Sequence, residues 1–292
     1  MRTLKDFQYL ARDFGRVLTN TDYFRMCPPV GAYFSDPRCY YLDWRAKVAW
    51  TGHYVDGVPM LYVPPLRKHE AVPVMILHYG LGSIDGYFTE GGEQYLSNIS
   101  NVSAWIANNL LPQGYCSNGI VERSPHRKYH SDNSAMAQGE LLSFCTRVIR
   151  HQLVTKGLAD RLEGFLSSIV TNMLLPLEQE GTTFRTDDDL YLCEFCEFCR
   201  DRDVVLNGWI FAIFGLMDYA AFRKTEAVQS ALEQTLTTLD RAMHRFVMPN
   251  GWSYYNLAGR VCAPHYHDLH VNLLTALAML TKKREVLGAL EK

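Results

Sequence analysis

Long helical segments separated by turn residues follow one another from residue 72 onward, and they constrain the fold more than any other feature of the sequence. Apolar residues recur at intervals of three and four within each segment, and glycine or proline marks the joints. The expected helices span residues 72–90, 93–111, 133–155, 157–173, 203–222, 225–247 and 266–281, with a short last helix from residue 282. Long helices in sequential pairs, without a solenoid repeat, predict a mainly α fold in which antiparallel pairs form an (α/α) toroid. A simple helix bundle is the alternative.

The first part of the chain has a different texture. Residues 3–19 have helical apolar spacing, whereas residues 20–69 hold prolines, many tyrosines and short alternating runs such as residues 59–63. Alternation of this kind indicates short strands between loops. We therefore expect an N-terminal helix plus an irregular, short-stranded segment over residues 1–69, packed on a helical domain that covers residues 70–292.

Composition excludes several classes of protein. Of the 292 residues, 48% are hydrophobic and 21% are charged, which is typical of a soluble globular protein. The formal net charge of −2 argues against a general nucleic-acid binder, which would carry a basic excess. The sequence shows neither a secretory signal nor an apolar stretch of 18 residues. These features predict a cytoplasmic protein without a transmembrane segment, and they leave peripheral attachment to a membrane open.

Three of the eight cysteines have a spacing seen in metal sites. Cys193, Cys196 and Cys199 are each three residues apart. A structural zinc site uses four ligands, usually as two separated pairs, and no second pair is evident. Because the helical spacing of small buried residues explains the pattern as well, we expect no metal at this cluster.

The stretch from Gly251 to Leu277 concentrates groups that suit proton transfer on an anionic substrate. It combines a turn and a helix start with tyrosine, arginine and histidine side chains: Tyr254, Tyr255, Arg260, His265, Tyr266, His267 and His270. Acid–base side chains beside a cation are what such chemistry requires. The alternative is that the aromatic residues pack and the histidines are surface or capping residues, and the residue types alone favour this alternative.

Two further segments allow both a structural and a functional interpretation. Residues 134–140 begin a helix with small residues, which favours close helix packing but also allows a ligand to approach the backbone. Asn207 lies near the start of a strongly apolar helix, where its amide needs a hydrogen-bond partner. That partner is either a neighbouring loop or a ligand.

Taken together and in order, these segments resemble the C-terminal domain of the D-glucuronyl C5-epimerase family, which modifies heparan-type polysaccharides. The resemblance covers about residues 40–280 and rests on the order and spacing of several short motifs. The motifs are YLDWRAK (41–47), VPML (58–61), VPV (72–74), HYGLGSID (78–85), SAMAQG (134–139), EF (197–198), VLNG (205–208), FGLMD (214–218), YNL (255–257) and YHDLH (266–270).

The resemblance implies an (α/α) toroid that binds a uronic-acid-containing glycan and moves the proton on carbon 5 of the uronate. It implies catalytic roles for Glu197, Tyr255 and Tyr266, and a substrate contact for Asn207. Further substrate-binding candidates lie in or beside the same motifs: Arg260, His267, His270, Gln138, Met136 and Tyr129. Neither a metal nor an organic cofactor is required by this chemistry.

The chain departs from the family pattern in four ways. Phe198 stands where the family has a tyrosine after the glutamate, and Ala258 stands where it has an arginine, although Arg260 follows two residues later. The link from Tyr255 to Tyr266 is shorter than in animal members, and we expect no counterpart of the family's N-terminal β-rich domain. We expect a smaller substrate, an oligomer such as a homodimer that completes the groove, or another polysaccharide.

The residues around the two tyrosines indicate which one acts as the base. Tyr266 begins a helix whose first turn carries His267 and His270, and cations together with a helix N-terminus favour the tyrosinate form. Tyr266 is therefore the expected base, and Tyr255 is expected to act as an acid or to bind substrate. The leading expectation is an epimerase acting on a polymer or a lipid-linked oligosaccharide. The alternatives are a uronate polysaccharide lyase and a non-catalytic glycan-binding toroid.

Overall fold

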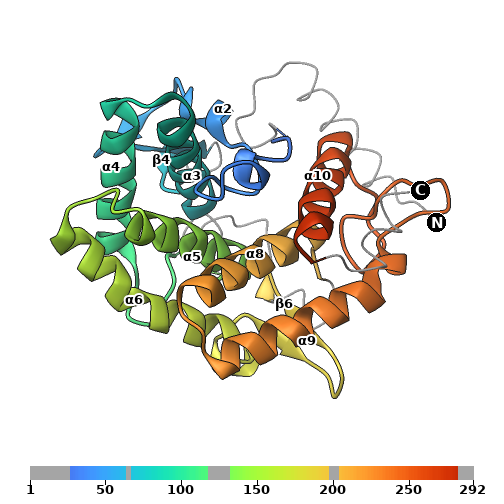
Figure 1. Cartoon of the computed structure of the whole chain (residues 1–292). Helices are drawn as coiled ribbons and strands as arrows, with labels where there is room; N and C mark the ends of the chain where they lie inside the picture. The colour runs from blue at the N-terminus through green and yellow to red at the C-terminus, as the bar shows by residue number, and fades with distance from the viewer. Residues whose placement is uncertain (1–26, 64–66, 118–131, 197–203, 282–292) are drawn as a thin grey trace.

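The computed structural model describes residues 27–63, 67–117, 132–196 and 204–281 (Figure 1). The helices expected over residues 3–19 and from residue 282 lie outside these residues. The mainly α fold is confirmed. The long helices are α3 (Pro73–Glu90), α4 (Glu93–Asn109), α5 (Ala135–Arg150), α6 (Lys156–Leu174), α8 (Leu206–Phe222), α9 (Glu226–Ala242) and α10 (Pro264–Thr281).

The long helices form two layers. Successive helices pair as α3 with α4, α5 with α6 and α8 with α9, because connections of a few residues return the chain beside the preceding helix. Helices α3, α5, α8 and α10 contact one another in that order and form an inner row, while α4, α6 and α9 lie outside them (Figure 1). Two layers of paired helices are a feature of the predicted (α/α) toroid, and its closed ring stays a prediction.

Helix α5 is shorter than its apolar pattern predicts. It begins at Ala135 because Ser134 has an extended backbone, and Gln152 adopts a left-handed φ of 55° two residues after the helix ends. A left-handed residue ends a helix by turning the chain out of its path. Residues 151–155 therefore form the turn to α6. Short helices complete the described chain: η2 (Ala32–Phe34), α2 (Arg45–Val48), η4 (Leu177–Gln179) and η5 (Met243–Arg245).

The described strands form three two-stranded antiparallel hairpins. The expected short strands near residue 60 are present as β1 (Tyr54–Val55), β2 (Val58–Pro59), β3 (Leu61–Val63) and β4 (Lys68–Glu70). The third hairpin, β5 (Thr183–Arg185) with β6 (Leu190–Leu192), was not expected from the sequence. Its strands are too short to show a period, and they are held by the neighbouring helix α9 through Thr235 and Thr238.

Helices α5 and α8 approach each other through two glycines. A Cβ atom on Gly139 would lie 2.5 Å from the carbonyl oxygen of Phe211, and one on Gly215 would lie 2.2 Å from the carbonyl oxygen of Gly139. Any side chain at either position would push the two backbones apart. The small residues that begin α5 therefore serve helix packing at Gly139, as the structural interpretation of this segment predicted.

A buried ion pair fixes the N-terminal segment on the helices. Arg147 of α5 pairs with Asp218 of α8, and the Tyr41 hydroxyl donates to the same carboxylate at 2.6 Å. The Arg147 guanidinium lies 5.0 Å from the ring centroids of both Tyr40 and Tyr41. A buried charge requires a partner of opposite sign. The motif residues Tyr41 and Asp218 are thus structural.

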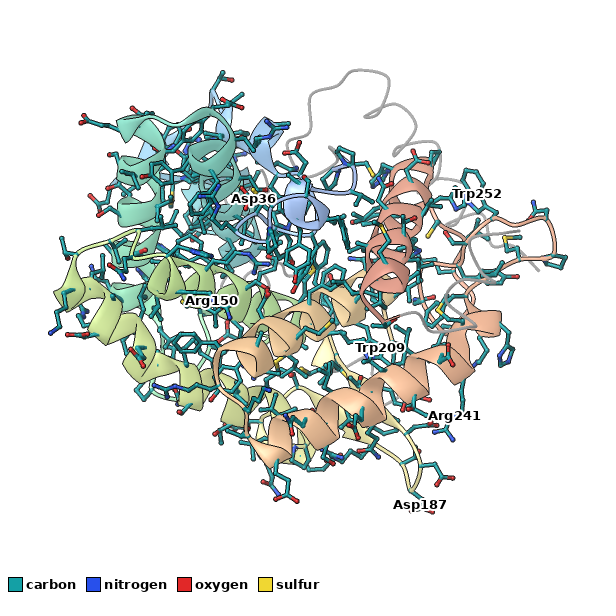
Figure 2. All side chains as sticks on the ribbon, in the orientation of Figure 1. Asp36, Arg150, Asp187, Trp209, Arg241 and Trp252 are labelled. Carbon is teal, nitrogen blue, oxygen red and sulfur yellow. The ribbon has the colours of Figure 1, made fainter. Side chains whose placement is uncertain are left out.

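The indole of Trp209 offers a test of the packing between α8, α9 and β6 (Figure 2). Its Nε1 donates to the Thr235 hydroxyl at 2.8 Å, and that hydroxyl donates to the Leu190 carbonyl at 3.1 Å. Thr235→Val leaves both groups unpaired in the core, so we expect a loss of about 1–3 kcal/mol in the free energy of unfolding. Urea denaturation measures it. The exposed Thr237→Val should change stability little, and an equally stable Thr235→Val protein would contradict the prediction.

None of the helices in the described part of the chain is long and apolar enough to cross a membrane.

Candidate functional site

The loop before α10 forms backbone hydrogen bonds with the start of α8 at the candidate site. The Leu206 amide donates to the Tyr255 carbonyl at 3.1 Å, and the Leu257 amide donates to the Val204 carbonyl at 3.0 Å. At the other side, the Ala135 amide at the start of α5 donates to the Cys193 carbonyl at 2.9 Å. Three segments far apart in the sequence, the start of α5, the residues from Cys193 to Leu206 and the loop around Tyr255, are thus joined by backbone hydrogen bonds.

Glu194 lies two residues after the end of β6, and its carboxyl group contacts the start of α8. The Asn207 side-chain amide donates to Glu194 Oε2 at 3.4 Å. A Cβ atom on Gly208 would lie 2.4 Å from the same oxygen, so the glycine leaves the space that this side chain occupies. Burial raises the pKa of Glu194 to about 8. A carboxyl group with this pKa can exchange a proton at neutral pH.

Asn207 is buried, with 3% of its surface exposed. Its Oδ1 atom has no hydrogen-bond partner among the described residues. A buried acceptor without a partner costs free energy, which a donor on a ligand would recover. Asn207 therefore has the position and the free acceptor required of a substrate contact.

The two expected catalytic tyrosines lie against each other. The ring centroids of Tyr255 and Tyr266 are 4.8 Å apart in an edge-to-face arrangement, and the Arg260 guanidinium carbon lies 5.2 Å from the Tyr255 ring centroid. Tyr266 is in the first turn of α10, and Arg260 is exposed. Burial, then the Glu194 carboxyl, raises the pKa of Tyr255 well above its ordinary value. Tyr255 therefore stays protonated at neutral pH.

The histidines of α10 do not supply the positive charge that the sequence suggested. Burial lowers the pKa of His270 to about 3, and burial also lowers the pKa of His267. Both rings are neutral at neutral pH, so the expectation that they act as cations is wrong. His267 instead stacks on Trp252 at 4.0 Å, and its Nδ1 lies 3.0 Å from the Ser253 hydroxyl. These contacts hold the loop before α10 in place.

The α5 residues proposed as substrate contacts are used inside the protein. Gln138 is fully buried, donates to Asn172 Oδ1 at 2.6 Å and accepts from the Thr182 hydroxyl at 3.3 Å. Met136 is part of the hydrophobic core. Because both ends of the Gln138 amide are occupied, its role is to join α5 to α6 and to the strand that follows, which corrects the expectation from the sequence.

The remaining expected positions divide into two groups. Glu197, Tyr129 and Cys199 lie outside the described residues. Cys193 is disulfide-bonded, so its sulfur is not a thiolate ligand, and the Cys196 thiol lies 3.5 Å from the Asn133 carbonyl oxygen.

A second buried polar cluster lies next to Glu194 and was given no role by the sequence analysis. His78 Nε2 lies 2.6 Å from Glu140 Oε1, and the Trp44 indole stacks on the His78 ring at 3.7 Å. Burial, then the charge of Glu194, raises the pKa of Glu140 well above its ordinary value. Burial lowers the pKa of His78 well below its ordinary value. Residues in or next to three of the resemblance motifs, Trp44, His78 and Glu140, therefore lie together next to Glu194. In the sequence, only the order of these motifs indicated that they belong to one site.

Comparison with known protein families shows which family the chain belongs to. Residues 129–292, more than half of the chain, match the family described as D-glucuronyl C5-epimerase C-terminus. The chain belongs to this family. Membership supports uronic acid epimerase activity in general and an isomerase class of enzyme. Comparison with curated proteins finds no match.

Among the described residues, the glutamate that lies beside Asn207 is Glu194. The sequence contains two Glu-Phe dipeptides, at residues 194–195 and 197–198, and the family resemblance implies a catalytic role for the second glutamate. Glu194 contacts Asn207 and influences the pKa of Tyr255. The signal that could have found it is the glycine after Asn207, because a missing side chain in the VLNG motif indicates close approach of another group.

Proposed function

We propose that this protein inverts carbon 5 of uronic acid units, of the D-glucuronate to L-iduronate type, in a polysaccharide or a lipid-linked oligosaccharide. The observation that carries the proposal is the convergence of Glu194, Asn207, Tyr255 and Tyr266 in a chain of this family. Epimerisation needs a proton acceptor on one face of the sugar ring and a proton donor on the other. It also needs groups that stabilise the charge on the substrate carboxylate.

The acceptor and the donor come from different elements. The rings of Tyr255 and Tyr266 are in contact, so a pyranose ring does not fit between them. We assign proton removal to the Tyr266 phenolate and proton return to the Glu194 carboxyl group. The C5–H electron pair moves into the carboxylate to form an enediolate, and the new C5–H bond forms with the proton of Glu194. Afterwards, Tyr266 gives up its proton to solvent and Glu194 regains one.

The other groups bind and polarise the substrate carboxylate. Tyr255 is held protonated and can donate through its hydroxyl group, and Arg260 brings a positive charge beside it. Arginine matches the planar geometry of a carboxylate. Together they stabilise the enediolate, which carries one more negative charge on these oxygens than the substrate.

Incubation of uronate glycans in deuterated water tests the reaction. We expect deuterium at carbon 5 together with inverted product, because the proton returned by Glu194 comes from solvent. Nuclear magnetic resonance of the product measures both. The absence of both exchange and inversion on every uronate glycan offered would refute the proposed reaction.

A uronate lyase is the second candidate, and the contact between the two tyrosines favours it. In such a lyase one tyrosine takes the proton on carbon 5 and returns it to the oxygen leaving carbon 4, so one face of the ring is sufficient. The product is an unsaturated uronate that absorbs ultraviolet light. Absorbance that rises as the polymer is cleaved, without inversion, would select the lyase over the epimerase.

The raised pKa of Glu194 predicts how turnover and stability depend on pH. Glu194 is protonated below about pH 8. We expect kcat/KM to fall above that pH, and the fall should disappear in Glu194→Gln, which does not titrate.

Because the folded state holds this proton more tightly than the unfolded state, Glu194 should lower the unfolding free energy as pH rises from about 4.5 to about 8. A wild-type kcat/KM that stays constant up to pH 10 would contradict the assignment of Glu194 as the proton donor.

A further inference from the structure

A hollow lies away from the candidate functional site, between the β1–β2 hairpin and α4. Its volume is 340 Å³, and its lining includes Tyr54, Tyr79, Gln94, Asn98 and Asn101. Helix α4 and the helix α10 that carries Tyr266 lie well apart in Figure 1. The hollow, called the amide groove below, is therefore separate from the site of the proposed reaction.

Three amide side chains line one face of α4. Gln94, Asn98 and Asn101 are four and three residues apart, so they lie on the same side of the helix. The Gln94 amide donates to Asn98 Oδ1 at 2.8 Å, and the Asn98 amide donates to the Ser83 hydroxyl at 3.4 Å. Asn98 is 3% exposed, so this row of amides is anchored in the protein and keeps its orientation.

The hairpin turn places Asn101 at the edge of the groove. Gly57 has a φ of 76°, and a Cβ atom at this position would lie 2.1 Å from Asn101 Nδ2. The turn therefore approaches the Asn101 amide closely, which only glycine allows. A primary amide offers two donors and one acceptor oxygen, a combination that suits a pair of neighbouring hydroxyl groups.

Two tyrosines also line the groove. The ring centroids of Tyr54 and Tyr79 are 6.0 Å apart in an edge-to-face arrangement, and the Tyr54 hydroxyl donates to the Trp50 carbonyl at 2.9 Å. Tyr54 is 36% exposed, whereas Tyr79 is 4% exposed. The Tyr54 ring is thus held by its hydroxyl group and still presents apolar surface to a ligand.

We propose that the amide groove binds an uncharged pyranose unit of a glycan. The amides match sugar hydroxyl groups, and the aromatic ring in the same groove matches the C–H face of the sugar. All the side chains that line the groove in the described part of the chain are uncharged, so it offers no cation to a uronate. The volume is within the range of small-molecule sites, which combine apolar surface with a few oriented polar groups. This inference does not depend on the proposed reaction.

Ligand-observed saturation-transfer NMR on the full chain tests the proposal. The probes are methyl β-D-glucopyranoside, methyl N-acetyl-β-D-glucosaminide and, as the charged comparator, methyl β-D-glucuronoside. We expect at least one neutral glycoside to bind with a dissociation constant on the order of millimolar, as for weak single-sugar contacts. Asn101→Ala and the exposed Gln94→Ala should each weaken that binding about three- to tenfold, the effect of one lost hydrogen bond.

Asn109→Ala is the matched control. Asn109 is an exposed amide on the same helix that donates to its own backbone at Trp105 and does not line the groove. The Asn109→Ala protein should bind the neutral glycoside as tightly as the wild type. Absence of saturable binding by both neutral glycosides, equal binding by Asn101→Ala and Asn109→Ala, or binding of the glucuronoside alone would overturn the proposal. None of these outcomes bears on deuterium exchange at carbon 5.

Discussion

Tyr266→Phe should lower turnover by at least about a hundredfold, the usual scale for removing a general base. Tyr266 is in the first turn of α10, where the helix N-terminus favours the tyrosinate form, and its ring packs on Tyr255. Substitution by phenylalanine keeps this ring contact and removes the oxygen that takes the proton. Deuterium incorporation at carbon 5 should fall in parallel with inversion, because no proton leaves the substrate.

Tyr254→Phe is the matched control for this experiment. Tyr254 is in the same loop, pairs with Val261 through its backbone, and is also only partly buried. It should keep nearly normal turnover. If Tyr266 only packs, its lost hydroxyl should cost about 1 kcal/mol of stability and little activity. Near-normal turnover in a folded Tyr266→Phe protein would assign proton removal to another residue.

Glu194→Gln should lower net inversion by about a hundred- to ten-thousandfold, the range for losing a positioned proton donor. The amide keeps the shape of the side chain beside Asn207 and Gly208 but has no proton to give to carbon 5. Tyr266 can still take the proton and return a deuteron to the same face. We therefore expect deuterium exchange to continue without inversion, which separates a donor from a residue that only shapes the site.

Two further variants locate the donor. Glu178→Gln removes an exposed carboxylate near the β5–β6 hairpin and should have no effect on inversion. Glu197→Gln tests the second Glu-Phe dipeptide. Inversion lost in Glu197→Gln and kept in Glu194→Gln would show that Glu197, and not Glu194, is the proton donor.

The sequence by itself was sufficient for the helices and the family. Seven of the expected helices are present among the described residues, because long amphipathic segments bounded by glycine and proline depend mostly on local spacing. The tyrosines of the site could also be named, since Tyr255 and Tyr266 belong to one loop and the helix that follows it. The β5–β6 hairpin was missed because three-residue strands carry no periodic signal.

Tertiary structure alone decided which groups lie together and how burial shifts their pKa values. Two identical Glu-Phe dipeptides lie three residues apart in the sequence, and the structure places Glu194 in the space beside Gly208, within reach of the Asn207 amide. The sequence indicated cationic histidines on α10, yet burial leaves His270 neutral. Desolvation depends on neighbours that come from distant parts of the chain. The sequence therefore determined which residue types are available, and packing determined which of them carry protons or charge.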